Sequence, residues 1–202
     1  MRRCNLLQRA MTSEPAETSD VDLLGRAMAG DEESFARLYH RRQGAVYRFA
    51  LQMSGRRSMA EEVTQEVFLV VIREGGRFDP QRGSLMAYLY GIARNCVLRC
   101  LDRDRVYVPI DDDPDADGSQ WTAKEDTLGD LTRGETIESV RQAVLALPAN
   151  FREVVVLCDL HEMSYADAAV ALDCAVGTVR SRLHRARGML LEKMKAGKRA
   201  FA

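Results

Sequence analysis

Apolar residues recur at intervals of three and four along most of this 202-residue chain, which is the period of an amphipathic α-helix. The pattern predicts a short helix over Asp22–Met28, ended by Gly30, and a long helix over Glu32–Met53. The stripe that the long helix would bury comprises Phe35, Leu38, Tyr39, Val46, Phe49, Ala50 and Met53.

A third helix is predicted over Met59–Arg73. Ser58, followed three residues later by Glu61, matches a capping box, and the two glycines at 75 and 76 mark the end of the helix. Its apolar face would contain Val63, Val67, Val70 and Val71.

A loop of turn-forming residues over 77–84 leads into a fourth helix, which Ser84 can cap and which runs to about Arg103. One face of this helix is apolar, and the other interleaves Tyr88 with arginines. Such interleaving suits single-stranded nucleic acid, because bases stack on rings while phosphates meet guanidinium groups. Taken alone, Tyr88 is more often a tyrosine at the edge of a core.

Residues 106–134 have the composition of a linker, with aspartates clustered among Pro, Gly and Ser. Helical periodicity resumes at about Glu135, Pro148 interrupts it, and a short apolar helix follows over Phe151–Asp159. No segment has a convincing strand pattern. The sequence therefore predicts an all-α protein with two small helical domains, over 20–105 and 135–202, joined by a flexible acidic linker. Residues 1–19 are predicted to form a disordered extension.

The stretch from Ser164 to Arg187 has the layout of a helix-turn-helix, in which the second helix enters the major groove of DNA. Ser164 can cap the first helix, and Asp173 falls where the turn needs a residue that tolerates positive φ. Thr178 can cap or open the second helix. The buried stripe of that helix would be Val179, Leu183, Ala186 and Leu190.

The second helix of this motif also carries four arginines, at 180, 182, 185 and 187. A run of charge is usually a solvated helix face, and that alternative applies here. From Val176 to the C-terminus, however, Glu192 is the only acid among eight basic residues, whereas a solvated face tends to mix signs. The imbalance favours contact with DNA.

The net charge of −1 hides an asymmetry along the chain. Residues 21–105 carry a net charge of +3, residues 106–134 a net charge of −6, and residues 135–202 a net charge of +2. Two mildly basic domains on either side of an acidic linker are the simplest account of this pattern.

Membrane insertion is not expected, because no apolar run approaches the ~20 residues that span a bilayer, and no signal peptide is evident. We therefore expect a cytoplasmic protein. The five cysteines are scattered, and Cys96 and Cys100 lie one helical turn apart without a second ligand pair. Zinc binding or redox sensing is an alternative, but buried apolar thiols are the commoner outcome for such residues.

Several motifs resemble those of the extracytoplasmic-function (ECF) sigma factors of the sigma-70 family. The segments Ala60–Phe68, Phe78–Ser84 and Leu89–Asn95 resemble region two of that family, and Leu147–Val154 and Val176–Arg187 resemble region four. The resemblance covers residues 20 to 195 apart from the linker. It departs at Tyr88, where the family often has Trp, and at Arg99, where an acidic residue is common.

The resemblance implies a bacterial transcription initiation subunit that joins core RNA polymerase, through its clamp helices and flap, and opens promoter DNA. It implies no catalytic residue, cofactor or metal, and an anti-sigma factor as a further partner. By position, the polymerase-facing residues would be Glu62, Gln65, Glu66 and Phe68, although Phe68 could instead belong to the core. The −10 element would meet Phe78, Arg82, Ser84, Tyr88, Arg94, Asn95 and Arg99. The −35 element would meet Thr178, Arg180, Ser181, Arg182, His184, Arg185 and Arg187.

Two other classes of function compete with this interpretation. A two-domain regulator would bind duplex DNA with the same C-terminal motif and sense a ligand with its N-terminal half, but residues 20–105 contain no pattern typical of a ligand pocket. An enzyme is disfavoured because His40, His161 and His184 are isolated from nucleophile motifs, and neither a phosphate-binding glycine loop nor a metal-ligand spacing is present.

Overall fold

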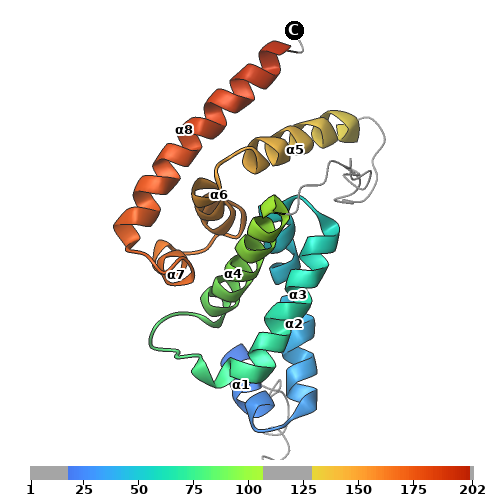
Figure 1. The fold of residues 1–202 in the computed structure, drawn as a ribbon, viewed down its shortest axis with the longest axis vertical. Coiled ribbons are helices and arrows are strands. Elements are labelled where there is room, and N and C mark those ends of the chain that lie inside the picture. Colours follow the sequence, from blue (N-terminus) through green and yellow to red (C-terminus); the bar gives the residue numbers. More distant parts are fainter. Residues whose placement is uncertain (1–17, 107–128, 201–202) are drawn as a thin grey trace, which may run out of the picture.

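The computed structural model describes residues 18–106 and 129–200, and every regular element in this part of the chain is a helix (Figure 1). The all-α prediction is confirmed for these residues. Residues 1–17 of the predicted N-terminal extension and residues 107–128 of the predicted linker lie outside them.

The N-terminal half consists of α1 (Asp20–Met28), α2 (Glu32–Ser54), α3 (Arg57–Glu74), the short 3₁₀-helix η1 (Gly75–Arg77) and α4 (Leu85–Val106). Side chains cap three of these helices: Ser19 accepts from the backbone N–H of Asp22, Asp31 from those of two residues of α2, and Ser84 from that of Ala87. The cap predicted at Ser84 is therefore present. Gly55, with φ of 74°, ends α2 in the left-handed conformation that favours glycine.

The capping box predicted at Ser58 and Glu61 is wrong. Helix α3 begins at Arg57, so Ser58 already lies in its first turn, and Arg56 occupies the cap position without a side-chain hydrogen bond. The hydroxyl of Ser54 accepts from the backbone N–H of Arg56 across the turn at Gly55. That turn, rather than a capping box, fixes where α3 begins.

The C-terminal half consists of α5 (Gly129–Leu145), α6 (Ala149–Val155), the π-helix η2 (Val156–Leu160), α7 (Tyr165–Ala171) and α8 (Val176–Ala200). Helix α5 begins within the stretch that the composition assigned to the linker. Pro148 stands at the N-cap position of α6, where its fixed φ suits the start of a helix.

The two halves pack against each other, which the sequence patterns did not indicate. A single apolar core contains buried residues of both halves, among them Phe49 and Leu89 from one and Leu157 and Leu183 from the other. Figure 1 shows α7 beside α4, and α5 also contacts α2. The two predicted domains therefore form one packed unit in this structure.

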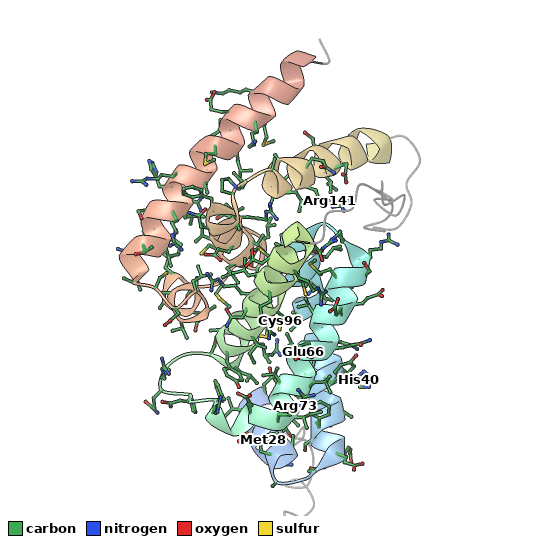
Figure 2. The ribbon with its side chains drawn as sticks, viewed as in Figure 1. Met28, His40, Glu66, Arg73, Cys96 and Arg141 are labelled. Carbon is green, nitrogen blue, oxygen red and sulfur yellow. The ribbon has the colours of Figure 1, made fainter. Side chains whose placement is uncertain are left out.

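Two arginines of the C-terminal half cap the end of α2. Arg152, half-buried on α6, donates to the carbonyl oxygens of Met53, Leu145 and Leu147, and burial lowers the pKa of its guanidinium. Arg141 of α5, labelled in Figure 2, donates to the carbonyl oxygen of Gly55 over 3.3 Å. Both cations meet the negative end of a helix dipole, which stabilises the contact between the halves.

A histidine links the halves at a second place. Nδ1 of His161 lies 2.8 Å from the hydroxyl of Tyr90 on α4, and its Nε2 lies 2.8 Å from Oε1 of Gln52 on α2. A neutral imidazole with its proton on Nε2 satisfies both contacts, because it donates to Gln52 and accepts from Tyr90. Burial, followed by the positive charge of Arg48, lowers the pKa of His161 to about 4.

Candidate nucleic-acid interface

The turn between α7 and α8 is built as the sequence predicts. The hydroxyl of Ser164 accepts from the backbone N–H of Asp167, 3.0 Å away, and so caps α7. Asp173 has φ of 48°, in the left-handed region, and the N–H of Cys174 closes the turn on the carbonyl of Ala169. Thr178 does not cap α8, which begins at Val176, but lies in its first turn.

Helix α8 has one buried face and one exposed basic face. Val179, Leu183 and Ala186 are buried against the rest of the half, and Leu190 is partly buried against the same core. The predicted −35 residues lie on the remaining surface, where Arg180, Ser181, His184, Arg185 and Arg187 are exposed, and Thr178 and Arg182 are partly exposed. Because the core holds the helix, its arginines stand on a rigid element, as major-groove reading requires.

The arginines of α8 differ in their partners. The guanidinium of Arg180 lies over the ring of Tyr165, 5.9 Å from its centroid. Arg187 forms a two-pronged ion pair with Asp159, at 2.6 and 3.1 Å, and this hydrogen-bonded pair raises the pKa of its guanidinium. Arg182 donates to Glu153 over 3.3 Å. Two of the four arginines therefore already face a carboxylate, and a DNA phosphate or base would have to compete with it.

The loop and helix predicted for the −10 element place their aromatic residues together. The rings of Phe78 and Tyr88 lie 5.6 Å apart, and the hydroxyl of Tyr88 donates to the carbonyl of Glu74 over 3.3 Å. Burial raises the pKa of Tyr88, and both rings are half-buried. Tyr88 therefore packs at the edge of the core, as the alternative interpretation predicts. The pair of Phe78 and Tyr88 also remains partly exposed to solvent.

The polar residues of the −10 set fall into two groups. Arg82, Asn95 and Arg99 are exposed. Ser84, which is also exposed, and the partly exposed Arg94 contact the C-terminal half: the N–H of Ser84 donates to Asp167 over 3.1 Å, and Nε of Arg94 donates to Glu153 over 2.6 Å.

Glu153 is a functional candidate that the sequence patterns did not single out. It lies on α6 with 1% of its surface exposed, and its two oxygens accept from Arg94 and Arg182. Its place on a short helix predicted to be apolar could have indicated a buried acid, since a carboxylate there needs cationic partners.

The residues predicted to meet polymerase do not share one environment. Glu62 and Gln65 are exposed on α3, and Glu66, labelled in Figure 2, is partly exposed. Phe68 is 3% exposed, and its ring packs at 4.8 Å from that of Tyr39. Its burial fits the alternative that it is a core residue, since the ring is not available to a surface partner.

Two exposed apolar residues accompany the polar ones on α3. Leu69 and Ile72 are 43% and 52% exposed, and they follow Gln65 at helical spacing on the same side. The sequence analysis did not single them out. It could have done so, because apolar residues outside the buried stripe of Val63, Val67 and Val71 must lie on another face of α3.

The chain matches two family models and is similar to several known proteins. The models are Sigma-70 region 2, over residues 38–106, and Sigma-70, region 4, over residues 137–190. The ECF RNA polymerase sigma factor SigE of Mycolicibacterium smegmatis is 32% identical over 181 residues, which are 89% of this chain and 68% of that protein. The RNA polymerase sigma-H factor of Pseudomonas aeruginosa is 31% identical over 180 residues, which are 85% of this chain and 91% of that protein.

Solved structures share the fold. The structure of CnrH in complex with the cytosolic domain of CnrY aligns with a TM-score of 0.63 at 22% identity, covering 89% of this chain and 99% of that chain. The sigma factor RpoE in complex with the anti-sigma factor NepR, from Bartonella quintana, aligns with a TM-score of 0.60 at 25% identity, covering 81% and 98%.

A helix-turn-helix with a basic face, packed on a helical half of the region 2 type, defines a transcription initiation factor of the sigma-70 type. Within that class, the chain belongs to the ECF sigma factors. Proteins of this family are non-catalytic subunits that bind core RNA polymerase and promoter DNA. The residues that the structure describes contain no group of three potential metal-ligating side chains, and no helix among them is long and apolar enough to cross a bilayer.

Proposed function

We propose that the two halves of this sigma factor divide promoter recognition between them. The half from residue 135 onward reads the −35 element with the exposed face of α8, through Thr178, Arg180, Ser181, Arg182, His184, Arg185 and Arg187. The half over 20–105 holds the opened −10 element with Phe78, Arg82, Ser84, Tyr88, Arg94, Asn95 and Arg99.

The basic face of α8 is the observation that carries this proposal. Arg180, His184 and Arg185 are exposed, and no carboxylate contacts them within the described part of the chain. The pair of Phe78 and Tyr88 supports the role of the N-terminal half, because stacking on aromatic rings offsets the cost of unpairing bases.

Core polymerase, we propose, meets the exposed face of α3. Glu62, Gln65 and Glu66 supply its polar contacts, and Leu69 and Ile72 extend it with apolar surface. An exposed apolar pair rimmed by polar groups is typical of a protein–protein interface. Phe68 has no direct role in this proposal, because it lies in the core.

An anti-sigma factor is the second proposed partner, and the cytoplasm, where polymerase works, is the proposed site of action. RpoE, which is similar to this chain, was solved with its anti-sigma factor NepR. An inhibitor of this kind would be recovered as a stoichiometric complex that prevents added core polymerase from using the protein.

Run-off transcription tests the proposal. Core polymerase supplemented with this protein should start at defined promoters on genomic fragments, whereas core polymerase alone should not. A regulator that only binds duplex DNA would leave core polymerase without promoter-specific starts, and that result would reject the proposal.

A further inference from the structure

A groove of about 180 Å³ opens between α2, α5 and the end of η2, and apolar side chains form most of its walls. Two of them are exposed to solvent, Ile137 on α5 by 52% and Leu160 on η2 by 42%. The other lining residues that matter here are Leu51, Val140, Val144 and Arg141. An open apolar groove is a surface on which a further apolar group is stabilised by burial.

Trp121 is the only tryptophan of the chain, and it stands in the acidic stretch between the two halves, outside the described residues. A docked indole buries roughly 150–250 Å² of surface, and its face also suits a guanidinium group. Aliphatic walls beside Arg141 therefore match this side chain in chemistry. The stretch itself, residues 106–134, carries a net charge of −6, and Arg141 offers it a cation at the groove.

The two helices that flank this stretch meet at one turn beside the groove. Asp104, two residues before the end of α4, pairs with Arg56 in the turn that follows α2. In the same turn, the carbonyl oxygen of Gly55 accepts from Arg141 of α5 over 3.3 Å. Because Leu51 lies one helical turn before Gly55, the end of α4 and the middle of α5 both lie near the groove.

The chain is long enough to bring Trp121 back to the groove. Trp121 precedes Gly129, the first residue of α5, by eight residues, which span at most about 26–29 Å. Ile137 and Val144 lie only about 12 and 22 Å along α5 from Gly129. The fifteen residues from Val106 to Trp121 allow about 50 Å on the side of α4. Closing loops of this length adds little entropic cost.

We propose that Trp121 docks in this groove and anchors the acidic stretch of its own chain on α5. The docked indole covers the exposed sides of Ile137 and Leu160 and lies against the guanidinium of Arg141. The inference goes beyond the proposed function and does not depend on it, because it requires neither promoter DNA nor polymerase.

The tryptophan fluorescence of the full chain reports on Trp121 alone. A docked indole should emit at a shorter wavelength than the indole of a synthetic peptide of residues 107–128, and acrylamide should quench it less. Ile137→Asp places a carboxylate in the groove, so the emission and the quenching should shift to the values of the peptide. The chain should still fold, because position 137 is exposed.

Leu191→Asp is the matched control. Leu191 is an aliphatic residue of α8 that is 57% exposed and does not line the groove, so the same kind of substitution there should leave the emission of Trp121 unchanged. Leu160→Asn repeats the test at a second exposed groove position if circular dichroism shows that Ile137→Asp fails to fold.

Photo-crosslinking identifies the surface that position 121 contacts. Benzoylphenylalanine in place of Trp121 should crosslink within the monomer to peptides that contain Leu51, Ile137 or Leu160. Wild-type emission and quenching equal to those of the peptide would overturn the docking. A blue-shifted emission that Ile137→Asp leaves unchanged, or crosslinks to other peptides, would overturn the groove as its site. An emission shift that depends on protein concentration would make a second copy the occupant and would overturn the proposal as well.

Discussion

Arg180 is the arginine of α8 for which we expect contact with a base pair, because it is exposed and an aromatic ring orients it. Its guanidinium is exposed and lies over the ring of Tyr165, which orients it while leaving its donors unpaired by any carboxylate in the described chain. Arg182 and Arg187, by contrast, must leave Glu153 and Asp159 or share them with DNA.

Arg180→Ala should weaken binding to the cognate −35 duplex by about 1–3 kcal/mol if the side chain contacts a guanine edge in bidentate fashion. Binding to random duplex should change far less. Anisotropy titrations of the holoenzyme with both duplexes measure the difference, and an equal loss on the two would mean that Arg180 contacts phosphate only.

Gln65 and Phe68 lie close together on α3 but differ in burial, so we expect their substitutions to have different effects. Phe68→Ala should cost about 3–5 kcal/mol of unfolding free energy, because it empties a space between aromatic rings in the core. Gln65→Ala should stay within about 0.5 kcal/mol of the wild-type stability, because the side chain is exposed, yet it should weaken binding to core polymerase.

Urea denaturation and a polymerase binding assay on the same two variants check this division. Unchanged polymerase affinity in Gln65→Ala would contradict the proposed face. A stability loss in Phe68→Ala below about 1 kcal/mol would contradict the core assignment.

At the scale of elements, the turn between α7 and α8 sets the angle of the recognition helix. Asp173 stands in the left-handed region, which costs about 1–2 kcal/mol for most side chains and little for glycine. Asp173→Gly should therefore be tolerated, while Asp173→Val should lower the unfolding free energy by at least about 1 kcal/mol, because a branched Cβ is strained there. Thermal unfolding of the two variants measures this, and equal melting temperatures would mean that the turn rearranges.

Local rules predicted most of the helices but not every boundary. Ser84 and Ser164 cap as expected because their hydroxyls reach free N–H groups within three residues, which is a purely local geometry. The cap predicted at Ser58 is wrong because the preceding turn, with Gly55 in the left-handed conformation, starts α3 at Arg57. A sequence that matches a capping box therefore does not mark the start of a helix when a neighbouring turn already sets that start.

At the scale of the whole molecule, the contact between the halves could not be predicted from the sequence. No periodic pattern distinguishes Arg94 bound to DNA from Arg94 bound to Glu153, because the guanidinium has the same chemistry toward either anion. Likewise, Gln52, Tyr90 and His161 lie far apart along the chain, and only the packed structure brings them together.

The histidine at this contact should make the packed state sensitive to pH. His161 faces Tyr90 and Arg48 and has its pKa lowered from 6.5 to about 4, so the packed form favours the neutral imidazole. The unpacked imidazole binds a proton below about pH 6.5, and the packed state therefore loses stability as the pH falls from 6.5 toward 4.

His161→Gln removes this titration while retaining groups for hydrogen bonding. The melting temperature of the wild type minus that of the variant should shrink as the pH is lowered from 7 to 5. Carboxylates titrate in both chains and cancel in the comparison. A difference that stays constant over this range would show that His161 does not titrate with unpacking.

The central claim is that this ECF sigma factor selects promoters with two separate sets of residues, one on the exposed face of α8 and one around the ring pair of Phe78 and Tyr88. Run-off transcription with core polymerase and genomic fragments tests it most directly. The wild-type chain should direct starts at defined promoters, and Arg180→Ala and Tyr88→Ala should each reduce the transcripts from those promoters. Full transcription by either folded variant would contradict the account.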